Sequence, residues 1–164
     1  MIHVGIDPGA DGAIVALFPV GPPIGHRMPV VEVTGRRRLD IGAARRMLLA
    51  LRDHDDLVVA IEAPSVRPGE GAVGALGIGL HHGAWHGLLG AMEIRHRIVV
   101  ARTWRDGLGL PKSPGDPKQR KADAILACER LLPGLDLAPK PLRKPHDGIA
   151  DAALIALWAR GQTW

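Results

Sequence analysis

Two apolar stretches of the chain each end on a carboxylate. Residues 4–6 have the pattern of a buried strand that stops at Asp7, and Pro8 and Gly9 then turn the chain. The pattern returns at residues 57–63, an apolar run suited to the covered middle of a sheet, which carries Glu62. If these strands lie side by side and parallel, Asp7 and Glu62 are neighbours. Two such carboxylates repel each other unless a proton or a cation lies between them, so the pattern predicts a metal site at the centre of a sheet.

The remaining pattern predicts three further strands and four helices. We expect strands at 12–18, 26–33 and 98–100, helices at 39–52, 72–92, 117–132 and 148–160, and a loop over 102–117. The tight connection at 10–12 makes the first two strands a hairpin, whereas later strands are separated by helical crossovers. The order predicts one α/β domain over residues 1–164, with a mixed five-stranded sheet and helices on both faces. The charge run at 36–38 is interpreted as a solvated loop in preference to a phosphate contact.

The helix expected at 72–92 is rich in glycine. Gly79, Gly83, Gly87 and Gly90 recur at three- and four-residue spacing, although each costs about 1 kcal/mol of helix stability relative to alanine. Glycines along one helix face let another backbone approach closely. We therefore expect a packing surface here, either against the sheet or against a second subunit.

Composition narrows the class of protein. The 164 residues are 46% hydrophobic, enough to bury a core, and the net charge of +4 is weak support for a polyanionic partner. Cys128 is the sole cysteine, which fits a reducing cytoplasm, and it reads as a small core residue. We expect neither a signal peptide nor a membrane span. His82 and His86 lack further ligands at suitable spacing, so packing is preferred over a zinc site.

Four acids form the candidate constellation: Asp7, Glu62, Asp147 and Asp151. The last two are four residues apart at the start of a helix, so they share one face. Each acid has a structural alternative, because Asp7 could cap its turn, Glu62 could pair with an arginine, Asp147 could be a helix N-cap and Asp151 a surface charge. Carboxylates gathered at one place suit Mg²⁺ or Mn²⁺, and a pair of such ions suits phosphodiester hydrolysis.

Three acidic motifs carry a resemblance to a known family. The segments at residues 5–9 (GIDPG), 61–64 (IEAP) and 146–152 (HDGIADA) resemble the RuvC-type Holliday junction resolvases, most strongly the compact phage and bacterial forms. Order and spacing agree across nearly the whole chain, and Trp104 with Arg105 also resembles a family feature. The resemblance implies an RNase H-like fold, a homodimer, and a crossover junction endodeoxyribonuclease. Such an enzyme nicks four-way DNA junctions in pairs with Mg²⁺ or Mn²⁺, two ions per site, and leaves 5′-phosphate and 3′-hydroxyl ends.

The resemblance also assigns residues. It makes Asp7, Glu62 and Asp151 metal ligands, but cellular members usually place a fourth ligand three residues before the last acid, where this chain has Gly148. We prefer Asp147 for that role, with His146 as the alternative. Lys118 and Lys121 match a basic stretch that faces DNA in the family. The full set of expected DNA contacts is Lys118, Arg120, Lys121, Arg143 and Lys144.

Two other classes of protein remain open at this point. A broader nuclease acting on flaps or forks shares the acids, and a junction-binding protein without useful catalysis shares the basic residues. An actin-like kinase or ATPase is excluded, because it needs two such domains. We expect a cytoplasmic protein of a bacterial cell or of a phage-infected host.

Overall fold

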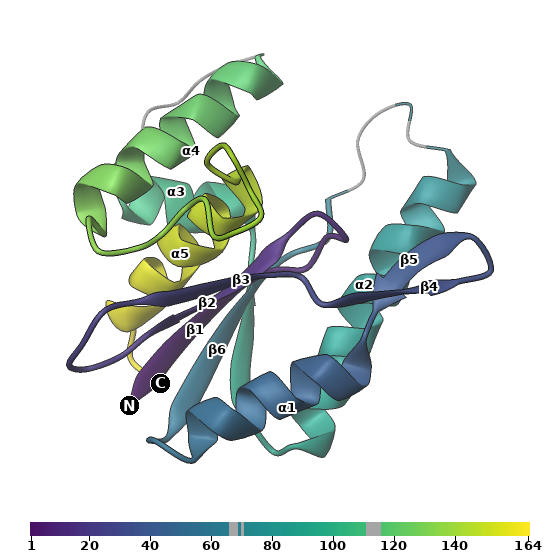
Figure 1. The fold of residues 1–164 in the computed structure, drawn as a ribbon, viewed down its shortest axis with the longest axis horizontal. Helices are drawn as coiled ribbons and strands as arrows, with labels where there is room; N and C mark the ends of the chain where they lie inside the picture. Colours follow the sequence, from purple (N-terminus) through teal and green to yellow (C-terminus); the bar gives the residue numbers. More distant parts are fainter. Residues whose placement is uncertain (66–68, 70, 111–115) are drawn as a thin grey trace.

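A five-stranded mixed sheet forms the centre of the computed structural model, which describes residues 1–65, 69, 71–110 and 116–164 (Figure 1). Its strand order is β3-β2-β1-β6-β7. The strands are β1 (Ile2–Asp7), β2 (Ala13–Leu17), β3 (Ile24–Arg27), β6 (Leu57–Glu62) and β7 (Arg95–Val99). The pairs β1/β2 and β2/β3 are antiparallel, and the pairs β1/β6 and β6/β7 are parallel. The expected mixed five-stranded sheet is confirmed.

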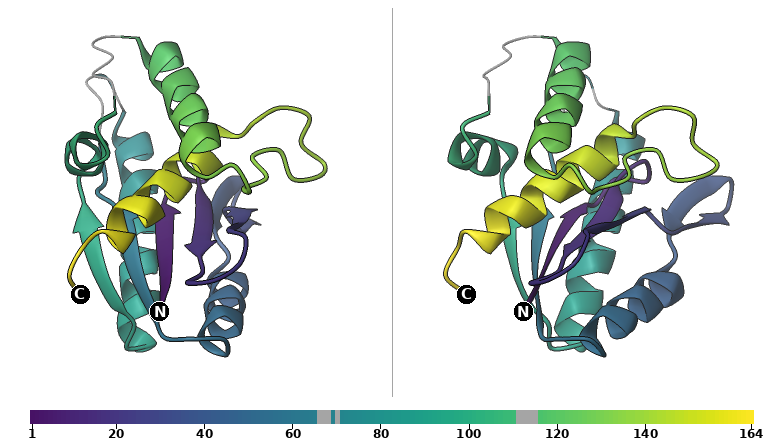
Figure 2. Two further views of the ribbon diagram at one scale, coloured as in Figure 1. Left: turned by 90° about the vertical axis from the view of Figure 1, so that its left-hand side faces the viewer. Right: turned by 60° about the vertical axis from the view of Figure 1, so that its left-hand side comes forward.

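Helices cover both faces of this sheet, as the sequence predicted (Figures 1 and 2). One face carries α3 (Ala101–Gly107), α4 (Pro117–Leu131) and α5 (Asp147–Arg160), and the other carries α1 (Ile41–Arg52) and α2 (Ala72–Ala91). Side chains alternate along β1 and β2, so the two faces supply two separate apolar clusters. Cys128 is buried in the cluster under α4 and α5, as its sequence context predicted.

The contact between α5 and β1 is a backbone-to-backbone crossing. A Cβ atom at Gly5 would lie 2.0 Å from the carbonyl oxygen of Ala152 and 2.4 Å from the amide nitrogen of Ala156. Only glycine fits at this position, because the helix occupies the space of a side chain. The crossing fixes the height and register of α5 above the C-terminal end of β1.

Two segments differ from the sequence-based expectation. The strand expected at 26–33 is divided into β3 and β4 (Val30–Val33), with the break at Met28 and Pro29, because a proline has no N–H for a ladder. The charge run 36–38, interpreted as a solvated loop, instead lies in β5 (Arg36–Leu39), which pairs with β4 in a ribbon outside the main sheet (Figure 1). Thr34 and Gly35, both with positive φ, make the tight turn between these strands.

The loop expected at 102–117 was also partly wrong. Its first part belongs to α3, and residues 111–115 lie outside the described part of the chain. Helix α3 has a weak local signal, because it has seven residues and no side chain caps its N-terminus. Trp104, which is 1% exposed, anchors it to the core instead.

Gly79, Gly83, Gly87 and Gly90 of α2 lie on the side of the helix that faces away from the sheet. The buried side of the helix consists of His81, His82, Trp85, Leu88 and Leu89. A Cβ atom at Gly79, Gly83, Gly87 or Gly90 would meet nothing within 4 Å. The sequence analysis expected these glycines to pack either against the sheet or against a second subunit. The sheet is therefore excluded as their packing partner. None of the helices in the described ranges combines the length and apolar character needed to cross a bilayer.

We predict that Gly5→Ala lowers the free energy of unfolding by about 3 kcal/mol or more, because strand or helix backbone must move to admit the methyl group. Gly79→Ala is the matched control, since its position is exposed and open, and it should stabilise the protein by about 0.5–1 kcal/mol. Urea denaturation of the purified variants measures both. Equal midpoints for Gly5→Ala and the wild type would contradict the described crossing.

Candidate active site

The first two acids lie side by side at the C-terminal ends of two inner strands of the sheet, β1 and β6. β1 and β6 are parallel with Ile6 opposite Ile61, so the next residues, Asp7 and Glu62, end neighbouring strands at the same level. Asp7 shares the face of Gly5, and Glu62 shares the face of Ala60, which packs under α5. The adjacency predicted from the two apolar stretches is therefore present.

The N-terminal turns of α5 lie above these two acids. His146 caps the helix, its Nδ1 accepting a hydrogen bond from the backbone N–H of Ile149 at 3.3 Å. Asp147 is thus the first residue of the helix, and the alternative that Asp147 is itself the N-cap is wrong. The helix dipole favours negative charge at this end.

Gly148 has a steric reason to be glycine. A Cβ atom there would lie 2.7 Å from the carbonyl oxygen of Asp11 and 3.0 Å from the Cα atom of Gly12. The turn between β1 and β2 therefore packs directly on the first turn of α5. An acid three residues before Asp151 does not fit this chain, which removes the usual family position for a fourth ligand.

Burial and mutual repulsion disfavour the charged form of three of the acids. Burial, and then the charges of Glu62 and Asp7, raise the pKa of Asp151 to about 8. Burial, and then the charge of Asp7, raise the pKa of Glu62 to about 7. Burial also raises the pKa of Asp7.

Asp147 has a cationic partner. Lys121 Nζ of α4 lies 2.6 Å from Asp147 Oδ2, and both side chains are partly exposed. The charge of Lys121 also lowers the pKa of Asp7, against the larger effect of burial. A residue expected to contact DNA therefore lies within the acid cluster itself.

Trp104 and Arg105 of α3 complete the site, and the sequence assigned them no role. Trp104 Nε1 donates a hydrogen bond to Glu62 Oε1 at 3.3 Å. The Arg105 guanidinium lies 5.2 Å from the centroid of the Trp104 ring, and its charge lowers the pKa of Glu62 and of Asp151. The adjacency of an aromatic and a cationic residue was visible in the sequence, but its closeness to Glu62 was not.

The donor set suits a hard divalent cation. Asp151 Oδ1 is buried and has no hydrogen-bond partner, so a buried oxygen is left for a ligand. Among the described residues, however, no three His, Cys, Asp or Glu side chains are gathered closely enough to hold an ion as they stand. His146 has one ring nitrogen engaged in the cap, and burial lowers its pKa, which favours the neutral imidazole.

The remaining basic residues named from the sequence are exposed on the two segments that lead to the site. Lys118, Arg120 and Lys121 lie on the exposed N-terminal turns of α4, and Arg143 and Lys144 lie in the exposed loop before α5. On the other side, all three arginines of β5 line a cavity of about 330 Å³ together with Pro8 and Gly9, which follow Asp7. Arg37 forms a two-bond ion pair with Asp11 at 2.7 and 2.9 Å.

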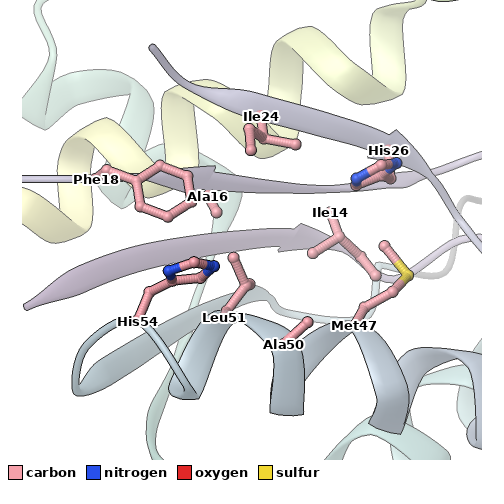
Figure 3. A pocket seen from close by; sticks show the side chains of 9 residues that line it. All are labelled: Ile14, Ala16, Phe18, Ile24, His26, Met47, Ala50, Leu51 and His54. Atoms are coloured by element: carbon pink, nitrogen blue, oxygen red, sulfur yellow. The ribbon is translucent and has the colours of Figure 1, made fainter. Parts of the chain in front are cut away.

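A second cavity lies apart from the acids. It occupies about 240 Å³ between β2, β3 and α1, and its lining is almost wholly apolar, with His26 and His54 the polar members (Figure 3). Ile14 and Ala16 of its wall belong to the cluster on the α1 and α2 face, opposite to Asp7 and Glu62. This cavity has no carboxylate and takes no part in the site.

Comparison with solved structures identifies the fold. The chain superposes on T. thermophilus RuvC in complex with a Holliday junction substrate with a TM-score of 0.61 at 19% identity, over 96% of this chain and 92% of that one. A second Thermus thermophilus RuvC structure gives a TM-score of 0.53 at 20% identity with the same coverage. The chain has the RuvC fold. The RNase H-like architecture expected from the sequence is thereby confirmed.

Sequence comparison agrees with the RuvC fold. The chain is 37% identical over 141 residues to the Holliday junction resolvase MOC1, chloroplastic, of Chlamydomonas reinhardtii. The match covers 79% of this chain but only 15% of that relative. No protein-family model matches the chain. The resemblance to RuvC-type resolvases seen in the three acidic motifs is confirmed by both kinds of comparison.

We predict that, without divalent ions, the protein loses stability between pH 5 and pH 8. The pKa of Asp151 is raised from 3.8 to about 8, so the folded state binds a proton that the unfolded state has released, and the stabilisation is lost as the pH rises toward 8. Asp151→Asn removes this group. The free energy of unfolding of Asp151→Asn minus that of the wild type should therefore increase by at least about 1.4 kcal/mol from pH 5 to pH 8, the equivalent of one pKa unit. Urea unfolding with chelator at the two pH values measures this, and a constant difference would contradict the raised pKa.

Proposed function

We propose that this chain is a structure-selective endodeoxyribonuclease that resolves four-way DNA junctions. The observation that carries the proposal is the convergence of Asp7, Glu62 and Asp151, with a buried unpartnered oxygen on Asp151, at the sheet edge of a RuvC fold. The sequence match to a protein named as a Holliday junction resolvase supports the same substrate.

In this proposal Asp7, Glu62 and Asp151 hold divalent cations, and Asp147 joins them after leaving Lys121. His146 is the alternative fourth ligand. Two Mg²⁺ or Mn²⁺ ions held by these residues would supply the activation of a water and the stabilisation of the leaving oxygen, for products with 5′-phosphate and 3′-hydroxyl ends. Lys121, once released, is placed to bind a phosphate beside the site.

The basic residues on either side of the acids support a nucleic acid as the substrate. The α4 lysines and the loop residues Arg143 and Lys144 are exposed on one side, and the arginines of β5 line the cavity on the other. Contacts of this kind give affinity through phosphate neutralisation, so binding should weaken steeply with salt. The single cysteine cannot form an internal disulfide, which fits the proposed cytoplasmic location.

We also propose that the protein is a homodimer joined through α2. Val73, Leu76 and Leu80 are 55%, 61% and 45% exposed, and with Gly83 and Gly87 they recur at alternating three- and four-residue spacing. This spacing is typical of a helix-to-helix seam, and the glycines permit close approach. Two subunits would bring two acid clusters to the two strands that a paired resolution must cut.

Cleavage of a labelled synthetic four-way junction, beside matched linear duplex and fork DNA, tests the proposed activity. With Mg²⁺ or Mn²⁺ the wild type should make paired nicks in the junction, and chelator should abolish them. Asp7→Asn, Glu62→Gln and Asp151→Asn should each lower the rate by about 10³-fold or more while the junction is still bound, because ligands are lost and positive residues remain. Asp53→Asn, on an exposed acid at the end of α1, is the control.

The other outcomes identify the rival functions. Equal cutting of fork and junction would indicate a broader branch nuclease. Tight junction binding without cutting under either metal would indicate a binding module with structural acids.

For the dimer, we predict that Gly83→Leu abolishes association. Leucine is favourable within a helix, and position 83 has open space around it, so the monomer should still fold. Light scattering of the wild type should give about twice the mass of the variant. Gly42→Leu, at an exposed position of α1, is the control for the same change elsewhere. An unchanged mass for Gly83→Leu would exclude α2 as the interface.

A further inference from the structure

We propose that Trp104 is the positioning residue of the acid cluster, fixing the carboxylate of Glu62 through its indole N–H and carrying the guanidinium of Arg105. The inference deepens the proposed function and rests on it, since it concerns how the ligand set is held ready for an ion.

The fold places Trp104 against Glu62 with little freedom. Glu62 lies opposite Val99 in the β6/β7 ladder, and the backbone N–H of Ala63 continues that ladder by donating to Val99 O at 2.8 Å. Helix α3 begins two residues after Val99, so its first turn lies immediately beyond the carboxylate. The Trp104 ring is 1% exposed and packs into the cluster beneath α5.

The other indoles of the chain show what is particular about Trp104. Trp85 is fully buried on the opposite face of the sheet, and its Nε1 has no hydrogen-bond partner. Trp164 Nε1 donates to a backbone oxygen, that of Ala159. Among the interactions of the described residues, the Trp104 N–H is the indole donor directed at a carboxylate. Filling the core requires the ring, but it does not require this N–H.

An indole suits the task because it is a neutral donor without acceptor capacity. It holds one oxygen of Glu62 by a hydrogen bond and adds no charge that would compete with a cation. The second oxygen of the carboxylate stays free of this bond. Donors of this kind orient metal ligands, and their loss typically weakens metal binding by 10- to 100-fold.

The ring has a second use. The Arg105 guanidinium lies 5.2 Å from its centroid, a contact that holds the cation without consuming its N–H groups. Arg105 Nη2 is buried and has no hydrogen-bond partner. Trp104 thus keeps a donor available for an anionic oxygen entering the site, while it orients Glu62 by its N–H.

Nuclear magnetic resonance of the ¹⁵N-labelled chain tests the hydrogen bond directly. The four tryptophans give four indole N–H signals, and the Trp104 signal is the one missing from Trp104→Phe. Glu62→Gln should shift the Trp104 signal far more than the Trp85, Trp158 and Trp164 signals, and Mg²⁺ should shift it in the wild type. If Trp104→Phe fails to fold in quantity, Trp85→Phe, Trp158→Phe and Trp164→Phe assign the other three signals and leave that of Trp104 by elimination. A Trp104 signal unmoved by Glu62→Gln would overturn the inference.

Mn²⁺ calorimetry without DNA tests the positioning role. Trp104→Phe keeps the ring and loses the N–H, so it should bind Mn²⁺ about 10- to 100-fold more weakly, and junction cleavage should need correspondingly more metal with a near-normal rate at saturation. Trp85→Phe is the matched control, since it also loses a buried indole N–H but has no carboxylate partner, and its Mn²⁺ affinity should be unchanged.

The outcomes separate this inference from the proposed activity. Equal Mn²⁺ affinity in Trp104→Phe and the wild type, or no Mn²⁺ binding by the wild type, would overturn the positioning role. If the wild type binds Mn²⁺ and Trp104→Phe binds it weakly, the positioning role stands, even if no junction is ever cut and the proposed function fails.

Discussion

The close crossing of α5 over β1 is the constraint on which the rest of the structure depends. The helix backbone occupies the place of a Gly5 side chain, so helix and strand meet with nothing between them. Along β1 the next residue on the same face is Asp7, and along α5 the corresponding turn carries Asp147 and Asp151. Gly148 then allows the turn after β1 to pack on the same helical turn. A looser crossing would move Asp147 and Asp151 away from Asp7 by the thickness of a side chain.

This arrangement places like charges where water solvates them poorly. The pKa of Glu62 and that of Asp151 are raised to about 7 and about 8, so the unliganded cluster is held together against the repulsion of its charged form. Two cationic side chains offset part of the free-energy cost of burying these carboxylates. Lys121 pairs with Asp147, and Arg105 acts on Glu62 and Asp151 from α3. Electrostatic repulsion of this kind is typical of sites that are completed by a ligand rather than by folding alone.

The surroundings of the cluster are consistent with a large anionic partner approaching from the open edge of the sheet. The basic turns of α4 lie on the α5 face of the sheet, and the β4–β5 ribbon extends beside α2 (Figure 1). The glycine face of α2 is directed away from the sheet. Gly83 and Gly87 of the proposed subunit contact are therefore directed away from the acid site, whereas Val73 of the same contact lines the cavity that also holds the β5 arginines.

The sequence by itself determined the elements whose signals are local. Apolar runs ending on Asp7 and Glu62 identified β1 and β6, the Asp116-Pro117 cap identified the start of α4, and the periodic apolar residues after Gly148 identified α5. The acids could be named because each follows or begins such an element. Only the tertiary structure decided the rest. The pairing of β5 with β4, the helix at 101–107, the Lys121–Asp147 ion pair and the Trp104–Glu62 hydrogen bond all join groups whose contact has no local periodicity. Their energies come from packing and charge between distant segments, and these exist only after the sheet has brought those segments together.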